Sequence, residues 1–171
     1  MYEINYYSDT MANISEKLNE AMNNQIKEEL ESAYIYLGMA AWFEERSLIN
    51  LAAWFDKQAE EEFEHAMKFK THILERGGTV HYQALAEQKQ DWTNVLEILE
   101  AAYEHEKYIT DKIVKLHEIA KELKEYSSNY LIQWFLEEQV EEEDNVSGLI
   151  DRYKGYKNDF NFDHHVKREE D

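Results

Sequence analysis

The chain has 171 residues with neither cysteine nor proline, and 37 acidic residues against 18 Lys and Arg give it a net charge of −19. Without cysteine it can form neither a disulfide nor a thiolate-bound zinc or iron–sulfur site, and its acidity argues against a nucleic-acid partner, because phosphate groups are bound by Lys and Arg. No apolar run reaches the roughly 18 residues of a membrane span, and the first residues do not have the pattern of a signal peptide, so we expect a cytoplasmic protein with no membrane partner.

Abundant Glu, Lys, Ala and Leu favour long helices over a sheet. Four segments have the periodicity of amphipathic helices, and each is long enough to extend about 45 Å at roughly 1.5 Å per residue. Asn13 and Glu16 are expected to form a capping pair at the start of the first helix, and Gly77-Gly78 is a common signal for the end of the second. The expected helices comprise about residues 14–44, 48–76, 91–123 and 128–156.

The connections between these segments differ in length, and this difference predicts the topology. Short turns join the first segment to the second and the third to the fourth, so each pair is expected to form an antiparallel hairpin. Residues 77–90 separate the second segment from the third, and at ~3.3 Å per residue they can travel the length of a bundle. The sequence therefore predicts an all-α four-helix bundle with one long crossover between helices two and three.

The predicted bundle occupies residues 14–156. Residues 1–13 are expected to form an N-terminal extension, and residues 157–171 a polar tail or a short fifth helix. The run Asp163-His164-His165 in this tail could bind a metal, but a flexible tail is the simpler interpretation.

Each predicted helix carries a stripe of apolar residues at alternating steps of three and four, the pattern of a face that packs inward in a bundle. Every stripe is interrupted near the middle of its helix by a glutamate. In the third helix, for example, Leu96, Leu99 and Tyr103 precede the glutamate and Thr110 follows it. The four glutamates are Glu29, Glu62, Glu106 and Glu142.

These four carboxylates indicate a metal centre. The midpoint of a helix lies at the same height whichever way the helix runs, so all four are expected to meet at one level of the core. Four buried carboxylates repel one another and each costs several kcal/mol to desolvate, whereas two divalent cations would supply four balancing charges. Any one of these glutamates could instead be a surface residue in an acidic run, but one in every stripe at the same height favours metal binding.

Two further residues refine the predicted ligand set. His65 follows Glu62 by three residues and therefore lies on the same face one turn later. Glu-x-x-His combined with single glutamates from other helices is the pattern of two-iron bundles, and oxygen ligands with one imidazole and no thiolate suit iron or manganese. Gln139 and Glu142 stand where a second Glu-x-x-His motif would place its glutamate and histidine, so the second metal should be held less tightly.

Three other residues near these positions have simpler interpretations when they are considered alone. Tyr36 lies on the inner stripe of the first helix, where a tyrosine usually serves packing, and the same holds for Trp134 in the fourth. His105 is next to Glu106 and therefore points to a different side of its helix, so an exposed histidine is expected there.

Four motifs carry a resemblance to a known family. They are Glu29-Leu-Glu-Ser-Ala-Tyr-Ile-Tyr36, Gln58-Ala-Glu-Glu-Glu62-Phe-Glu-His65, His105-Glu106 with Ile109-Thr110, and Trp134-Phe-Leu-Glu-Glu138-Gln139-Val-Glu141-Glu142. In this order they resemble the four helices of non-haem ferritins of the prokaryotic type, and the similarity extends over about residues 13–156. The resemblance implies a ferritin-like bundle that assembles into a hollow shell of 24 identical chains, oxidises Fe(II) with O₂ or hydrogen peroxide, and stores ferric mineral inside.

The resemblance also implies a role for each matching residue. Glu29, Glu62 and His65 would hold the first iron, and Glu62 would bridge to a second iron. Glu106 and Glu142 would hold this second iron with Gln139 adjacent. Tyr36 would supply an electron, with Trp134 beside it. A third iron nearby would be bound by Glu61, Glu138 and Glu141.

Some features depart from related families. Bacterioferritin resembles the chain more distantly, and Phe63 stands where that family has its haem-ligating methionine, so no haem is expected. Rubrerythrin is disfavoured because it needs a cysteine-bound iron. The C-terminal segment is shorter and more charged than the fifth helix of typical ferritins, which leaves the four-fold contacts of the shell open.

Two alternative functions remain open at this point. One is a two-iron bundle enzyme that oxidises a substrate or scavenges peroxide and stores nothing. The other is a metal-free helical adaptor whose acidic stripes bind a partner protein.

Overall fold

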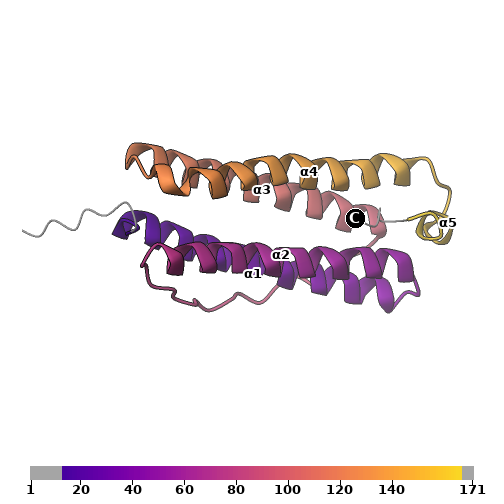
Figure 1. The fold of residues 1–171 in the computed structure, drawn as a ribbon. Coiled ribbons are helices and arrows are strands. Elements are labelled where there is room, and N and C mark those ends of the chain that lie inside the picture. The colour runs from indigo at the N-terminus through magenta and orange to yellow at the C-terminus, as the bar shows by residue number, and fades with distance from the viewer. Residues whose placement is uncertain (1–12, 167–171) are drawn as a thin grey trace, which may run out of the picture.

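The structure, a computed structural model, describes residues 13–166, so residues 1–12 of the predicted extension and residues 167–171 lie outside it. In Figure 1, α1 and α2 form one antiparallel hairpin, α3 and α4 form a second hairpin above it, and the crossover runs along the lower hairpin. The predicted all-α four-helix bundle with one long crossover is confirmed. Its elements are α1 (Glu16–Glu44), α2 (Ile49–Glu75), α3 (Val95–Glu122), the one-turn 3₁₀ helix η1 (Tyr126–Ser128), α4 (Asn129–Lys154) and the short α5 (Asp159–Asp163). Between residues 13 and 166, no helix combines the length and the apolar character that a membrane crossing requires.

The ends of the first hairpin follow local rules, with one correction. The predicted Asn13–Glu16 capping pair is wrong, because α1 begins at Glu16 and the cap is Ser15, whose Oγ accepts a hydrogen bond from the Leu18 amide at 3.4 Å. The predicted end of α2 is confirmed, since Gly77 follows the helix with φ +67°, a left-handed conformation that glycine adopts without strain.

The crossover is fixed to α1 along its length. The Asn23 side chain donates to the Thr79 carbonyl oxygen at 2.9 Å, near the start of the crossover. Farther along, the Ala86 amide donates to Glu31 Oε1 at 2.9 Å. At the other end of α1, the Trp42 indole donates to the carbonyl oxygen of Trp92 at 3.0 Å. The crossover therefore returns the chain to the end where α2 began, and α3 runs parallel to α2.

The core consists of two apolar clusters at different heights of the bundle. One cluster contains residues such as Tyr36, Phe43 and Phe55. The other contains residues such as Ile26 and Phe69. Along each long helix the buried residues between the two clusters are polar, and this layer contains the candidate site.

The predicted inner face of α3 was rotated slightly from the observed one. Leu96, Tyr103 and Thr110 are only partly buried, whereas positions one residue earlier face the core. The strict three-four spacing misplaced this face because α3 packs against both α4 and α1 and therefore turns a broader stripe inward. The buried residues of α3 are Val95, Ile98, Leu99, Ala102, Glu106, Ile109, Ile113, Leu116 and Ala120.

The C-terminal segment folds back onto the end of the bundle. The predicted short fifth helix is confirmed as α5, and Figure 1 shows it at the end of α4 farthest from the start of α1. Asp163 is buried and accepts hydrogen bonds from the Leu51 amide at 2.8 Å and from Asn50 Nδ2 at 3.0 Å. The interpretation of Asp163-His164-His165 as a flexible tail was wrong, because Asp163 supplies the cap that the start of α2 does not have in its own side chains.

Candidate metal centre

A layer of acidic and polar side chains lies between the two apolar clusters. It consists of six residues, and each of them is at most 4 % exposed. All four long helices contribute to the layer, and the carboxylates of the four interrupted stripes are all in it. The layer contains Glu29, Glu62, His65, Glu106, Gln139 and Glu142.

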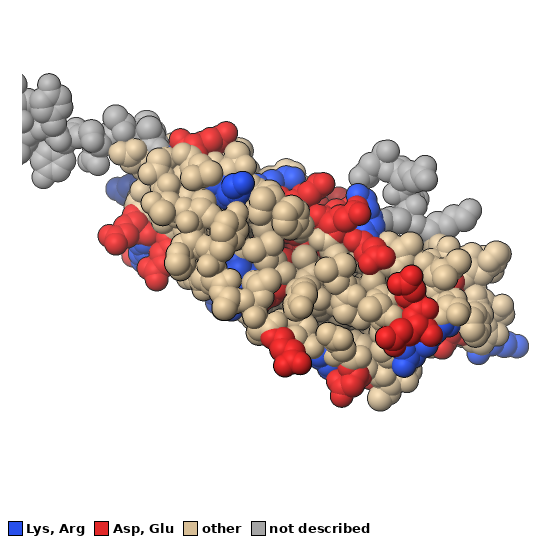
Figure 2. Space-filling view, turned by 90° about the horizontal axis from the view of Figure 1, so that it is seen from below, with Lys and Arg blue, Asp and Glu red and all other residues tan. Residues whose placement is uncertain are grey.

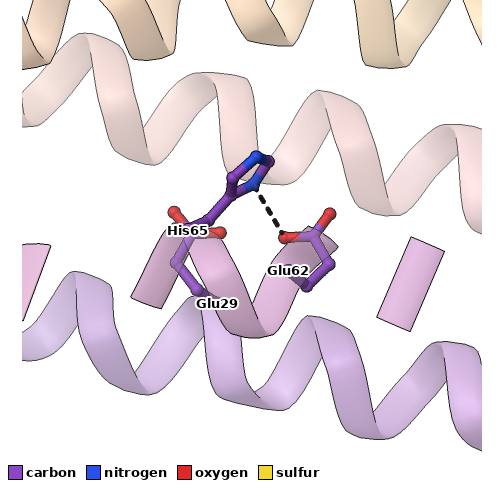
Figure 3. A group of neighbouring side chains, drawn as sticks. All are labelled: Glu29, Glu62 and His65. Atoms are coloured by element: carbon purple, nitrogen blue, oxygen red, sulfur yellow. Dashed lines mark ion pairs between the residues drawn. The ribbon is translucent and has the colours of Figure 1, made fainter. Parts of the chain in front are cut away.

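The lower hairpin provides the best-defined part of this layer. Single oxygen or nitrogen atoms of Glu29, Glu62 and His65 lie within 4.8 Å of one another, close enough to bind one metal ion. Figure 3 shows Glu29 extending from α1 and the other two from α2, with the three side chains pointing toward one another. His65 Nδ1 lies 3.4 Å from Glu62 Oε2, an ion-pair distance.

A second group of this kind involves α4. His65, Glu138 and Glu142 also offer ligand atoms within 4.8 Å of one another. His65 Nε2 lies 3.7 Å from Glu138 Oε1. The imidazole therefore stands between carboxylates of α2 and α4.

Glu106 is the residue of the layer that α3 contributes, and both of its carboxylate oxygens accept hydrogen bonds. The Tyr36 hydroxyl donates a hydrogen bond to Glu106 Oε1. Gln139 Nε2 donates to Glu106 Oε2 at 3.2 Å. Tyr36 is fully buried at the border of one apolar cluster, so its hydroxyl serves the polar layer while its ring serves packing.

Two buried glutamines hold further carboxylates, and sequence reasoning missed both. Gln25 Nε2 donates to Glu29 Oε1 at 2.9 Å, and Gln58 Nε2 donates to Glu142 Oε2 at 2.8 Å. Gln25 could have been found, because it lies four residues before Glu29 on the same helix face. Gln58 likewise lies four residues before Glu62, but its partner Glu142 is on another helix, so the spacing does not identify this contact.

Buried polar atoms that make no hydrogen bond indicate what the layer could bind. Among the described residues, Glu29 Oε2, Gln58 Oε1 and His65 Nδ1 are buried and make no hydrogen bond. Each unsatisfied buried polar atom costs about 1–3 kcal/mol. These atoms are of the types that bind a hard or borderline cation, so the residues present fit a metal ion at this position.

The carboxylates of the layer are poor acids in the absence of a cation. Burial raises the pKa of Glu106 to about 7. Burial, with added repulsion from Glu106 and Glu62, raises the pKa of Glu142 to about 8. Burial and the nearby Glu62 also raise the pKa of Glu29 well above 4.5. At neutral pH Glu142 is therefore mostly protonated and Glu106 about half protonated, and a cation has to displace these protons.

The imidazole compensates part of this negative charge. Burial by itself disfavours its charged form, but contacts with Glu138 and Glu62 outweigh burial and raise the pKa of His65 to about 11. The contact with His65 in turn lowers the pKa of Glu138. His65 is therefore an imidazolium in the metal-free centre and has to lose a proton before it can bind a metal.

Several predicted site residues lie at the edge of this layer. Trp134 is half-buried, with its ring centre 5.5 Å from that of His65 and Lys68 Nζ 4.7 Å from its ring centre. Glu61 is half-buried and Glu141 is exposed. Within residues 13–166, neither carboxylate belongs to the two groups of close ligand atoms.

The expectation that His105 is exposed was wrong. Its ring is half-buried, and Nε2 lies 2.7 Å from Ser32 Oγ. Its ring centre lies 6.0 Å from that of Tyr36. Because α1 and α3 pack closely here, the outer side of this turn of α3 is covered by the small Ser32 side chain.

Comparisons with known proteins agree with this geometry. Residues 19–155 match the protein family described as Ferritin-like domain. The chain is 35 % identical over 141 residues to the bacterial non-heme ferritin of Bacteroides fragilis strain 638R, covering 82 % of this chain and 89 % of that protein. The bacterial non-heme ferritin of Campylobacter jejuni is also 35 % identical over 141 residues, covering 82 % of this chain and 84 % of its own.

A solved structure gives the same result in three dimensions. The chain superimposes with a TM-score of 0.83 and 38 % sequence identity on an open pore ferritin from the hyperthermophilic archaeon Archaeoglobus fulgidus. The superposition covers 86 % of this chain and 90 % of that one. Sequence and fold therefore agree over most of the molecule.

Proposed function

Because this chain belongs to the ferritin family, we propose that it stores iron and that it oxidises Fe(II) to Fe(III) at the buried carboxylate centre. The observation that supports this assignment most strongly is the convergence of four buried glutamates and one histidine from four helices in an otherwise apolar core. Iron storage and Fe(II) oxidation are the general function of the family. Family membership also removes the metal-free adaptor from consideration.

Fe(II) is the substrate of the proposed reaction, and charge is the reason that it binds. Two Fe(II) ions bring four positive charges to four carboxylates, which lose their protons as the ions enter. Glu29 and His65 bind one ion, Glu106 and Glu142 bind the other, and Glu62 lies between them. O₂ or hydrogen peroxide accepts the electrons of both ions, and the protein holds the ions with positions open for the oxidant.

Residues around the centre are proposed to assist the reaction. Tyr36 contacts Glu106 through its hydroxyl and is the residue best placed to supply an electron. Trp134 lies in ring contact with His65 and is a second candidate for this role. We propose that Glu61, Glu138 and Glu141 bind a third iron on its way out of the centre, since they are progressively more accessible than the buried ligands.

Storage requires an enclosed assembly of identical chains, and we propose a 24-chain shell in the cytoplasm. Exposed large apolar side chains on α1 and the crossover support an interface between copies. Figure 2 shows the side of the bundle seen from below, where uncharged residues form a broad area and the acidic residues gather in separate groups. The exposed apolar residues of α1 and the crossover include Tyr34, Leu37, Tyr82 and Leu85.

The Glu62→Ala variant tests the oxidation step. It removes the carboxylate placed between both ions, so we expect the initial rate of O₂ uptake with Fe(II) to fall at least about 100-fold while the shell still assembles. The matched control is Glu60→Ala, which removes an exposed carboxylate of the same helix. Rapid O₂ uptake by the Glu62→Ala shell would contradict the proposal.

The size of the particle separates storage from the remaining alternative. A shell of 24 chains of 20.5 kDa elutes from gel filtration as a very large particle. A dimer or tetramer that oxidises Fe(II) and retains no mineral would instead indicate a two-iron enzyme without a storage function.

A further inference from the structure

Gln139 places a neutral amide among the glutamates of the polar layer. A fifth carboxylate there would bring five negative charges against the four positive charges of two Fe(II) ions. A carboxylate presents an oxygen whichever way it turns, whereas an amide presents either an oxygen or an NH₂ group. An amide ligand therefore needs neighbours that fix its orientation.

Three oxygens surround the nitrogen of this amide. Gln139 Nε2 lies 3.2 Å from both the backbone carbonyl oxygen and Oε2 of Glu106. It lies 3.3 Å from Thr110 Oγ1. The two Glu106 oxygens can serve as acceptors, but a threonine hydroxyl can either donate or accept, so Thr110 alone would not define the orientation.

Glu143 removes this ambiguity. Thr110 Oγ1 donates to Glu143 Oε1 at 2.6 Å, a short hydrogen bond of the charge-assisted kind. A hydroxyl has one hydrogen, so Thr110 can then only accept from Gln139. A flipped amide would place its oxygen against three acceptors, which would repel it.

The position of Glu143 suits this role. It is half-buried and lines a surface cavity of about 580 Å³ together with Glu141 and Asp144. Its charge therefore lies at the edge of solvent, where desolvation costs little, and its hydrogen bond to Thr110 connects it to the core.

We propose that Thr110 and Glu143 are positioning residues that fix the amide of Gln139 with its carbonyl oxygen available to the second Fe(II). This inference rests on the proposed function, because it assumes that two metal ions occupy the layer. Thr110 and Glu143 are not metal ligands in this proposal: Glu143 acts on Thr110, and Thr110 acts on Gln139.

Anaerobic calorimetric titration of the assembled protein with Co(II) tests this role. In Thr110→Val, which keeps the shape and removes the hydroxyl, the affinity of the second Co(II) is expected to fall roughly tenfold while the first is unchanged. Thr110→Ser retains the hydroxyl and is expected to restore the affinity of the unaltered protein. Glu143→Gln frees the hydroxyl to turn and is expected to give an intermediate loss, which also covers the case in which Thr110→Val fails to assemble.

A double variant distinguishes positioning from general damage. Gln139→Ala should weaken the second site, and adding Thr110→Val to it should cause no further loss, because Thr110 has no other route to the metal. Losses that add in the double variant, or unchanged Co(II) binding in Thr110→Val, would overturn the inference. Failure of the unaltered protein to bind two Co(II) ions would instead overturn the proposed function.

Discussion

At the scale of single residues, the centre has more acidic groups than its metal-free form can ionise. Burial raises the pKa of Glu106 to about 7 and that of Glu142 to about 8. Contacts with Glu138 and Glu62, working against burial, raise the pKa of His65 to about 11. The metal-free centre therefore reduces its own charge by holding protons, and metal binding is an exchange of cations for protons.

This exchange predicts proton release on metal binding. Addition of Co(II) without oxygen at pH 7, in weak buffer, should release about two protons per chain, because Glu142 and His65 are protonated beforehand. A pH-indicator dye measures the release. Tight binding of Co(II) with no change in pH would show that these groups are already deprotonated in the metal-free protein.

The meeting of the buried glutamates and His65 could be predicted from the sequence, but a supporting contact between helices, such as that of Gln58 with Glu142, could not. One glutamate per apolar stripe and the Glu62-x-x-His65 spacing are periodic features, and periodicity is what a sequence displays directly. Gln58 donates to Glu142 from another helix, and such a contact depends on how the helices pack. The half-buried state of His105 depends in the same way on the small Ser32 of α1.

At the scale of elements, the helix lengths and the crossover follow from local signals, whereas the face of α3 and the role of α5 do not. The glycine pair ends α2 by backbone geometry alone. The inner face of α3 depends on its partner helix, so a fixed spacing misplaced Tyr103 and Thr110. The docking of α5 depends on a carboxylate that reaches the start of α2, more than a hundred residues earlier in the chain.

The docking of α5 predicts a specific stability effect. Asp163→Ala removes the acceptor for the Leu51 amide, so α2 loses its cap and α5 loses its attachment. We expect the free energy of unfolding to fall by about 1–2 kcal/mol. Chemical denaturation followed by circular dichroism measures the change.

The matched control for this prediction is His164→Ala, which changes an exposed neighbour of Asp163. That variant should unfold like the unaltered protein. Equal stability of the Asp163→Ala variant would show that α5 contributes nothing to the cap of α2.

At the scale of the whole molecule, a polar layer separates two apolar clusters, and its protonation couples to stability. The folded-state pKa values of Glu142 and His65 lie above their ordinary values of 4.5 and 6.5. The folded chain therefore holds more protons than the unfolded chain at neutral and mildly alkaline pH, and the stability of the metal-free protein falls as pH rises. Burial lowers the pKa values of His72 and His105. These two residues therefore affect stability only below about pH 6.5, where the unfolded chain takes up protons that the folded chain does not, so stability there falls as pH falls.

This coupling predicts that the chelated protein becomes less stable between pH 7 and pH 9. The loss should be on the order of 3 kcal/mol, which lowers the melting temperature by roughly 6–12 °C for a chain of this size. Calorimetric scans with and without Co(II) measure it, and Co(II) should raise the melting temperature more at the higher pH. A melting temperature that is flat or rises over this range in the chelated protein would contradict the protonation of the centre.

The most direct test of the proposed two-iron centre is the position of bound iron. Crystals of the protein soaked with Fe(II) without oxygen give anomalous scattering at the iron absorption edge, which locates each ion. The proposed two-iron centre predicts two peaks in the layer between the apolar clusters, one near Glu29 and His65 and one near Glu106 and Glu142, with Glu62 between them. Peaks confined to the acidic surface, with none in this layer, would contradict it.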